Sequence, residues 1–183
     1  MEILSRFRKW AEREYSVKQR VIALLFEGLF FVAVVPFFLV VSSSRLDMWF
    51  NFPRFTYGTI NFIVATPLIV VGLWLAMWAV WIQFSLGRGT PTPLMPTQRL
   101  VVEGPYAYCR NPMSLGTIVF YLGIAVWIGS LSAAGLTLTF SALLIMYDKL
   151  IEEKELEERF ASEYLEYKRK TPFLIPRLWK RRK

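Results

Sequence analysis

Long apolar blocks alternate with short charged segments along this chain. The first block, Val21–Val41, contains one charged residue, Glu27, and the second, Thr59–Leu86, contains none. A helix that crosses the hydrocarbon core of a bilayer needs about 20 predominantly apolar residues. Each of these two blocks therefore predicts one membrane-spanning helix.

A third apolar block, Met113–Tyr147, is also uncharged but is too long for one span. Gly129–Ser132 lies near its middle and is typical of a tight turn. Each arm of the resulting hairpin has about 15–17 residues, which is at the short end of what can cross a bilayer. The expected fold class is all-α: a polytopic membrane protein with four transmembrane helices, the last two forming a hairpin, and with cytoplasmic amphipathic helices.

The other segments complete a single domain, 1–183, around these spans. Residues 1–20 place apolar side chains on one helical face and charges opposite, a pattern typical of a helix lying on the membrane. A helical cap packed on the rest of the protein explains this pattern equally well. We expect two spans in 21–86, a cytoplasmic loop in 87–112, the hairpin in 113–147, and a cytoplasmic helix with its tail in 148–183.

An apolar stripe marks the helix that is expected to continue beyond Tyr147. Its members recur at helical spacing on an otherwise charged segment: Leu156, Phe160, Tyr164 and Tyr167. Because the residue before a proline disfavours helical backbone, the helix should end at Thr171-Pro172. The next residues, Phe173–Pro176, are expected to fold back onto the membrane face.

The charges predict an orientation in the membrane. Hydrophobic residues make up 55% of the chain and the mean hydropathy is +0.38, which is too apolar for an ordinary soluble domain. Of the 22 basic residues, all except Arg45 and Arg54 precede the first span, lie between the second and third, or follow the fourth. The positive-inside rule places these segments, and both termini, in the cytoplasm. The net charge of +8 therefore indicates topology rather than a nucleic-acid partner, and the lack of an organelle-type targeting segment favours a prokaryotic plasma membrane.

The residue inventory excludes several kinds of catalysis. The chain has no histidine and one cysteine, Cys109. It can form no intramolecular disulfide, no Ser-His-Asp triad and no Cys-His pair. Most zinc sites need the same side chains, so we expect no metal.

Four features lie in or beside the first two spans, and two of them, Glu27 and the glycine segment, allow more than one interpretation. Glu27 is an intramembrane acid and so a candidate for function, although pairing with Arg20 near the interface is the simpler explanation. Pro36 is expected to kink the first span, and the aromatic residues of an outer loop, Ser42–Tyr57, are typical of an interfacial belt. The Gly87-Arg88-Gly89 segment after the second span favours either close approach of a ligand or a simple helix end before a proline-rich loop.

Polar residues flank the predicted hairpin at both ends. Arg110 and Asn111 precede the third span, and Glu152 and Glu153 follow the fourth. Because a hairpin brings its two ends together, these groups should be neighbours at the cytoplasmic surface. Spacing alone leaves two alternatives: an interfacial salt bridge that fixes the hairpin, or a site for a polar ligand.

The combination of motifs resembles the isoprenylcysteine carboxyl methyltransferase and phospholipid methyltransferase superfamily. The resemblance covers roughly Gly87 to Pro176, about half of the chain. Its motifs are Leu100-Val101 with Gly104-Pro105-Tyr106, then Arg110-Asn111-Pro112-Met113 with Gly116, then Glu152-Glu153 with Leu156, Phe160, Tyr164, Tyr167 and Ile175-Pro176. It implies S-adenosylmethionine (SAM) as methyl donor on the cytoplasmic side, and a lipid or prenylated small molecule that enters from the bilayer as acceptor.

The resemblance also implies roles for individual residues. Arg110, Glu152 and Glu153 are the predicted catalytic residues, and all three are expected to contact the cofactor as well. The other predicted cofactor-binding residues are Gly87, Gly89, Gly104, Tyr106, Asn111, Pro112 and Met113. On physical grounds the arginine suits the cofactor's carboxylate and a glutamate suits its ribose diol or amino group.

Two positions depart from the family pattern and concern the acceptor. Asn111 stands where many isoprenylcysteine enzymes have histidine, and in this it is similar to the phosphatidylethanolamine enzymes, which have Asn-Pro-Met. Ser114 stands where tyrosine is usual in the family. The sequence thus leaves prenylcysteine-like carboxylates and phospholipid amines both open. Two other functions also remain: an NADPH-dependent membrane reductase of the sterol-reductase type, and a non-catalytic membrane scaffold protein.

Overall fold

In the computed structural model, residues 15–90 and 95–177 are described, and every regular element in them is helical. The predicted surface helix in 1–20 lies largely outside these ranges, as does most of the basic tail after Arg177. The α-helices and the intervening short turns are α2 (Val17–Leu29), a π turn (Phe30–Val34), α3 (Val35–Phe50), α4 (Thr59–Ile82), a second π turn (Gln83–Gly87), a 3-10 turn (Gly104–Ala107), α5 (Pro112–Ile128), α6 (Leu131–Tyr147), a third π turn (Asp148–Glu152) and α7 (Glu153–Lys170).

The first helical rod is longer than expected. It runs without a break from Val17 to Phe50, and Asn51 ends it in left-handed backbone with φ 51°. The predicted outer loop Ser42–Tyr57 is therefore wrong in its first half, because Ser43 and Asp47 are buried. Asp47 Oδ1 accepts a hydrogen bond of 3.1 Å from the backbone N–H of Ser132, so packing on α6 extends the helix.

A kink is expected at Pro36, and the helix has a π turn, Phe30–Val34, just before this residue. Proline lacks an N–H and cannot donate to the carbonyl four residues earlier, which loosens the preceding turn. The Tyr121 hydroxyl of α5 donates a hydrogen bond of 2.8 Å to the Phe31 carbonyl in this turn. A side chain from a neighbouring helix thus fills a gap in the backbone hydrogen bonding.

The hairpin predicted for the third apolar block is confirmed. Gly129 ends α5 in left-handed backbone with φ 62°, and the Ser130 side chain accepts a hydrogen bond from Ala133 N at the start of α6. Glycine adopts such backbone without the steric cost that a Cβ brings. Gly129 therefore ends α5, and the adjacent Ser130 begins α6.

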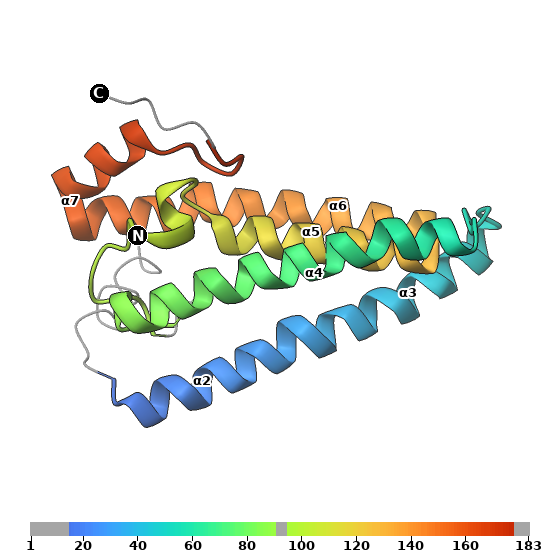
Figure 1. Ribbon diagram of the computed structural model, residues 1–183, viewed down its shortest axis with the longest axis horizontal. Coiled ribbons are helices and arrows are strands. Elements are labelled where there is room, and N and C mark those ends of the chain that lie inside the picture. The colour runs from blue at the N-terminus through green and yellow to red at the C-terminus, as the bar shows by residue number, and fades with distance from the viewer. Residues whose placement is uncertain (1–14, 91–94, 178–183) are drawn as a thin grey trace.

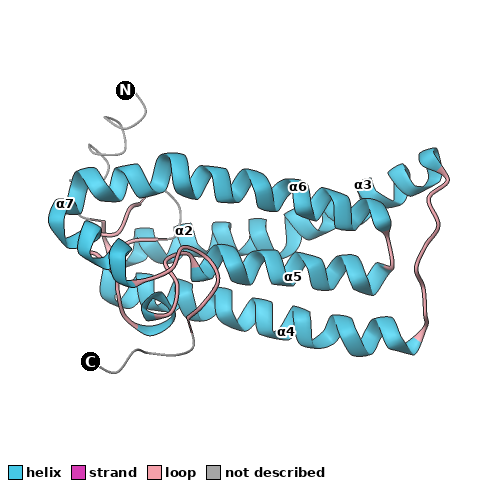
Figure 2. Cartoon of the chain, turned by 90° about the horizontal axis from the view of Figure 1, so that it is seen from above, coloured by secondary structure: helices cyan, strands magenta, loops and turns pink. Residues whose placement is uncertain are grey.

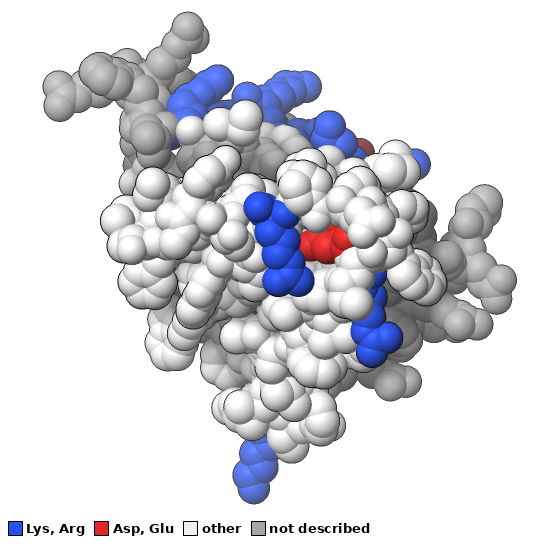
Figure 3. Space-filling model, turned by 90° about the vertical axis from the view of Figure 1, so that its right-hand side faces the viewer, with Lys and Arg blue, Asp and Glu red and all other residues white. Residues whose placement is uncertain are grey.

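Among the described residues, three helices are long and apolar enough to cross a membrane: Val17–Phe50, Thr59–Gly87 and Leu131–Lys170. The fourth apolar helix in the described part of the chain, Pro112–Ile128, is shorter at 17 residues. These helices indicate a membrane protein. Figure 3 views the end of the molecule that carries the segment after α3, where most of the surface is uncharged and a basic side chain lies beside an acidic one near the centre.

Helices α4 and α5 lie side by side along their length (Figure 2) and pack through glycines. A Cβ added to Gly72 would lie 2.4 Å from Phe120 N, and one added to Gly116 would lie 2.6 Å from Ala76 N. Small residues let membrane helices approach closely in this way. The interface between α4 and α5 is therefore closed along its middle.

The helix α7 does not continue straight. Ala161 has φ 42° and ψ −116°, and the second half of α7 turns back, so that the segment after it runs toward the start of α5 (Figure 1). The end of α7 at Lys170 is as predicted, but the stripe from Leu156 to Tyr167 does not lie on one straight helix. The reversal brings Tyr164 and Tyr167, which are both buried, over the motifs that precede α5.

Candidate functional site

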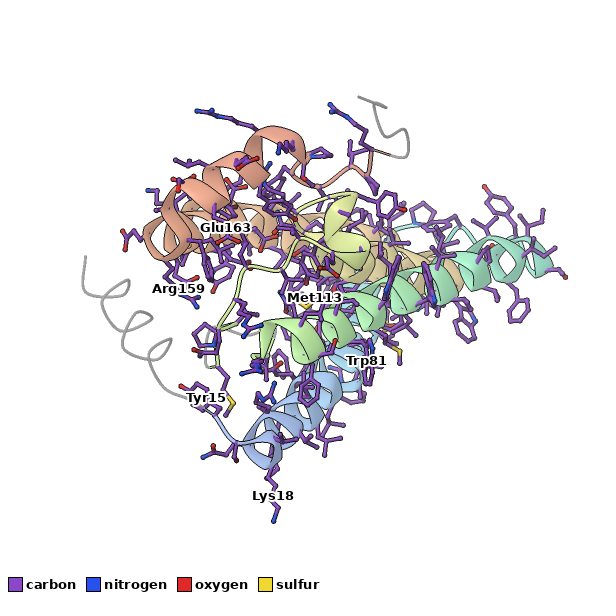
Figure 4. The ribbon with its side chains drawn as sticks, turned by 60° about the vertical axis from the view of Figure 1, so that its left-hand side comes forward. Tyr15, Lys18, Trp81, Met113, Arg159 and Glu163 are labelled. Carbon is purple, nitrogen blue, oxygen red and sulfur yellow. The ribbon has the colours of Figure 1, made fainter. Side chains whose placement is uncertain are left out.

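One cavity lies where α4 ends, α5 begins and α6 passes into α7. Counting the open solvent at its mouth, it contains about 460 Å³ not filled by protein atoms. Figure 4 views this end of the molecule, with Met113 at the start of α5 and Arg159 and Glu163 on α7. The cavity is lined by Gln83, Thr97, Leu100, Val101, Tyr106, Arg110, Asn111, Glu152, Glu153, Leu156, Tyr164 and Tyr167.

The predicted neighbours Arg110 and Glu153 are in direct contact. Glu153 Oε1 accepts hydrogen bonds from Arg110 Nε at 3.1 Å and from Nη2 at 2.5 Å, and both side chains are about nine-tenths buried. Lys168 Nζ lies 2.7 Å from the other oxygen, Oε2. Glu153 therefore lies between two cations: Arg110, which precedes α5, and Lys168, on the returning half of α7.

The rest of the Arg110 guanidinium is engaged by the backbone. Nη1 donates hydrogen bonds to the carbonyls of Lys168 at 3.1 Å and Thr171 at 2.6 Å, and the Tyr164 hydroxyl also lies beside it. The two hydrogen bonds to carbonyls and the two to Glu153 use four of the five N–H groups of the side chain. Arg110 thus fastens the returning half of α7 to the segment before α5. For Arg110 to bind a cofactor carboxylate, as expected from the sequence, some of these hydrogen bonds to the protein would have to be replaced by bonds to the carboxylate.

The segment before α5 also pairs with the chain after α7 through backbone hydrogen bonds. Arg110 N donates to Pro172 O at 2.9 Å, and Asn111 donates to Phe173 O through both its backbone N–H and its side chain. Arg177 N donates to Tyr108 O at 3.1 Å. The tail therefore folds back against the arginine motif, and this pairing holds both in place.

Glu152 brings a second acidic side chain to the cavity wall. It shares the π turn with Asp148, which is 2% exposed, and the two carboxyl groups are in hydrogen-bond contact. The Ser114 hydroxyl of α5 lies beside Asp148. Sequence reasoning missed Asp148, although a single acid directly after an uncharged block of helix was a signal available in the sequence.

Two buried polar groups in the cavity have no hydrogen bond within the described part of the chain. They are the Tyr106 hydroxyl and Gln83 Oε1, which lie close to one another. Burial, together with the nearby Glu152, raises the pKa of Tyr106 well above its usual value, so the phenol remains protonated. Buried polar groups are nearly always satisfied, so these two atoms can bond to one another or to a molecule in the cavity. Gln83 was also missed, although it is the one amide side chain near the end of an uncharged helix.

Aromatic residues of α7 hold Tyr106 in position. The Tyr167 hydroxyl donates a hydrogen bond of 2.7 Å to the Tyr106 carbonyl, and the Tyr164 and Tyr167 rings meet edge to face with centroids 6.1 Å apart. The spacing of these tyrosines was visible in the sequence. Their contact with Tyr106 depends on the reversal at Ala161, which was not.

The predicted Gly87 and Gly89 are not among the described residues that line the cavity. A Cβ on Gly89 would lie 2.6 Å from Thr97 N and Cα, and one on Gly87 would lie 2.8 Å from Thr97 Cγ2. Arg88, not a glycine, takes the left-handed backbone, with φ 56°. These glycines let the chain near Thr97 cross the end of α4, and that chain forms one wall of the cavity.

Gly104, Pro112 and Met113, also predicted to contact a cofactor, lie behind the cavity wall. Gly104 begins the 3-10 turn with φ 60°, where an added Cβ would lie 3.0 Å from Ile82. Pro112 is buried at the start of α5, and Met113 packs against the buried cluster that contains Tyr106. They shape the site without lining it.

The ion pair expected between Glu27 and Arg20 stays a prediction. Glu27 Oε1 accepts a hydrogen bond of 3.0 Å from the Thr90 hydroxyl. Arg20 Nη1 donates to the Phe84 carbonyl at 3.0 Å, within the π turn Gln83–Gly87. Polar side chains of the first rod therefore fasten the end of α4 beside the cavity.

Cys109 is buried beside the site, and burial raises the pKa of its thiol to about 11. A thiol that stays protonated is a poor nucleophile. Residues 15–90 and 95–177 contain no cluster of three or more side chains suited to hold a metal ion. The chemistry available at this site therefore comes from carboxyl, amide, phenol and guanidinium groups.

Comparison with known families places this geometry in context. The family profile described as phospholipid methyltransferase matches residues 60–163, more than half of the chain. The chain belongs to the phospholipid methyltransferase family. This confirms the resemblance seen in the motifs and supports a membrane methyltransferase.

Two curated relatives are bacterial and carry names of metal resistance. The chain is 31% identical over 150 residues to the nickel-cobalt-cadmium resistance protein NccN of Alcaligenes xylosoxydans xylosoxydans, covering 80% of this chain and 62% of that protein. It is 33% identical over 146 residues to the cobalt-zinc-cadmium resistance protein CzcN of Cupriavidus metallidurans, covering 76% of this chain and 57% of that protein. The chain thus spans about three-fifths of the length of these relatives.

Proposed function

We propose that this protein transfers a methyl group from SAM to a lipophilic acceptor at the cytoplasmic face of a bacterial plasma membrane. One observation carries this proposal. Both family motifs, Arg110-Asn111 and Glu152-Glu153, line a single cavity at one end of the apolar helices.

The side chains of the cavity fit the donor chemically. SAM carries a sulfonium and an ammonium group against one carboxylate, so it is a net cation, and Glu152 and Glu153 supply opposite charge. The apolar and aromatic walls from Leu100, Val101 and Tyr164 suit its flat base. The unsatisfied Tyr106 hydroxyl and Gln83 Oε1 are suitable partners for hydroxyl or amine groups.

When bound, SAM supplies an activated methyl group and leaves as a neutral thioether, so the reaction needs no metal and no covalent nucleophile. The protein's part is to hold donor and acceptor in line and to exclude water. Arg110 acts mainly by positioning Glu153, since most of its N–H groups are engaged by the protein. An amine acceptor must lose a proton, which Glu152 can accept, whereas a carboxylate acceptor needs no base.

The same proposal includes four spans with both termini in the cytoplasm. The shortest of these four spans is α5, whose 17 residues pack tightly on α4. The cavity then lies on the side where the sequence concentrates its basic residues. An acyl or prenyl chain would reach it from the bilayer along a route other than the closed middle of the α4–α5 interface.

The acceptor is either a phospholipid amine or a prenylcysteine-like carboxylate. The names of the relatives tie those proteins to metal resistance, and we extend this setting to the present chain as a proposal. Its target would then be a membrane component methylated during exposure to metal. Incubating a lipid extract with the enzyme and deuterated donor, followed by mass spectrometry, identifies the product and separates N- from O-methylation.

Ligand binding to the purified protein tests the donor. We expect saturable binding of labelled SAM and none of NADPH, with Glu153→Ala and Arg110→Ala each abolishing SAM binding in folded protein. Glu166→Ala, which removes an exposed acid of α7 paired with Lys170, is the matched control and should bind normally. Binding of NADPH instead would indicate a reductase, and binding of neither would favour a scaffold protein.

A further inference from the structure

Asp148 is a buried acid that the proposed function leaves without a role. It is 2% exposed and begins the π turn that joins α6 to α7. One of its oxygens, Oδ2, has no hydrogen bond to any described residue. Its other contacts are the carboxyl group of Glu152 and the hydroxyl of Ser114.

The described cations near this carboxyl pair are engaged elsewhere. Arg110 and Lys168 bind Glu153, and the Lys149 ammonium lies 4.9 Å from the centre of the Phe173 ring. The described groups that face the pair are hydroxyls or further acids, from α5, the 3-10 turn, the end of α6 and both halves of α7: Ser114, Tyr106, Tyr147, Glu153, Glu155 and Tyr164. When two carboxyl groups are in contact and no described cation lies between them, the like charges disfavour the state in which both are ionised.

A second observation points to a cationic guest at this pair. Glu152 lines the cavity together with Tyr106, which is 6% exposed and whose hydroxyl lacks a partner among the described residues. A guest that reaches the Tyr106 hydroxyl therefore also reaches Glu152. In the proposed reaction the donor brings a positive sulfonium to this place, and the spent product, S-adenosylhomocysteine, does not.

We infer that Asp148 and Glu152 share one proton in the donor-free protein, and that the cationic donor displaces this proton when it binds. The inference rests on the proposed function and adds a positioning residue to it. With the proton gone, both carboxylates face the sulfonium. After methyl transfer the sulfur is neutral, and the pair takes up a proton again from solvent. Asp148 thereby makes the site prefer fresh donor over product.

This coupling has a direct thermodynamic signature. If binding releases one proton, the dissociation constant falls as pH rises, by up to about tenfold per pH unit. Product binding leaves the proton in place, so its dissociation constant should change little over the same range. Asp148→Asn removes one carboxylate of the pair, so Glu152 can carry its charge alone and donor binding releases little or no proton.

Isothermal titration calorimetry on the full-length protein in detergent tests this. SAM and S-adenosylhomocysteine are each titrated at several pH values between 5.5 and 8, in pairs of buffers with different ionisation enthalpies. We expect about one proton released per SAM and almost none per product. In Asp148→Asn, proton release and the preference for SAM over product should both fall to less than half. Glu166→Gln, an exposed acid on the same helical rod, should match the wild type.

The wild-type titrations alone can overturn the inference, so it does not depend on whether Asp148→Asn folds. Equal proton release with SAM and with product would contradict it while leaving SAM binding, and hence the proposed function, intact. Unchanged proton release in a folded Asp148→Asn protein would contradict the role of that residue. No binding of either ligand by the wild type would overturn the proposed function and this inference together.

Discussion

Arg110 Nη2 lies 2.5 Å from Glu153 Oε1 and joins the residue two places before α5 to the first residue of α7. The two residues lie 43 positions apart, on either side of the α5–α6 hairpin. The same guanidinium also binds two carbonyls at the end of α7. A single side chain thus closes both the hairpin and the fold-back that form the cavity.

The first prediction concerns this pair. Arg110→Ala should lower the free energy of unfolding by about 3 kcal/mol, because it leaves Glu153 buried beside one cation instead of two. For a chain of this size the melting temperature should fall by about 6–12 °C. Thermal unfolding in detergent measures this. The double variant Arg110→Ala/Glu153→Ala should lose less than the sum of the single variants, and strict additivity would show that the pair does not interact.

A second prediction addresses the glycines between α4 and α5. Gly116→Ala should destabilise the protein by about 1–3 kcal/mol, since the new methyl group would meet the backbone of Ala76 at 2.6 Å. Gly135→Ala is the matched control because a Cβ there meets nothing within 4 Å. In α6 it should be neutral or stabilising by up to about 1 kcal/mol. Equal melting temperatures for the two variants would contradict the close packing.

The reversal in α7 leads to a third prediction. Ala161 adopts φ 42° and ψ −116°, a region that costs a residue with a Cβ about 1–3 kcal/mol and costs glycine little. Ala161→Gly should therefore raise the melting temperature and leave SAM binding intact. Ala142→Gly, at an exposed position within α6, should lower it instead. A loss of stability in both variants would indicate that α7 is straight.

The features that depend on neighbouring residues in the sequence were predicted better than those that depend on tertiary contacts. The turn at Gly129-Ser130 and the end of α7 before Pro172 follow from local backbone preferences, and both were predicted correctly. The contact of Arg110 with Glu153 was predicted because a hairpin leaves few alternatives.

The misses have tertiary causes. Ala161 is a good helix former, so nothing local marks the reversal, and the carbonyl contacts of Arg110 that depend on it were hidden as well. The expected outer loop began at Ser42, yet Ser43 and Asp47 are buried within α3, and Asp47 accepts a hydrogen bond from Ser132 of α6. Gln83 and Asp148 each had a signal in the sequence, but that signal alone did not show that their polar atoms are buried at the site.

A fourth prediction uses the single cysteine. Because Cys109 is buried and its thiol has a pKa of about 11, it should react with a maleimide at least tenfold more slowly than an exposed thiol at pH 7.5. The reaction should accelerate as pH rises toward 11 and become fast on unfolding. Ser162→Cys in a Cys109→Ala background, at an exposed position of α7, provides the fast reference.

The same reference variant tests the proposed orientation. A membrane-impermeant maleimide should label Ser162→Cys in inverted vesicles and leave it unlabelled in intact spheroplasts, because the cavity end faces the cytoplasm in the proposed topology. Labelling in intact spheroplasts would reverse the assignment of sides.

The widened turn Asp148–Glu152 has a consequence for how this protein tolerates changes in length. A π turn accommodates one residue more than an ordinary helical turn does, and each helical residue rotates the rest of the helix by about 100°. Removing one residue there would let the rod become uniformly α-helical and would swing Glu153 away from Arg110. Insertions and deletions should therefore be rare at this junction, even where they preserve its charge and hydropathy. The number of residues in the turn sets the position of Glu153 relative to Arg110.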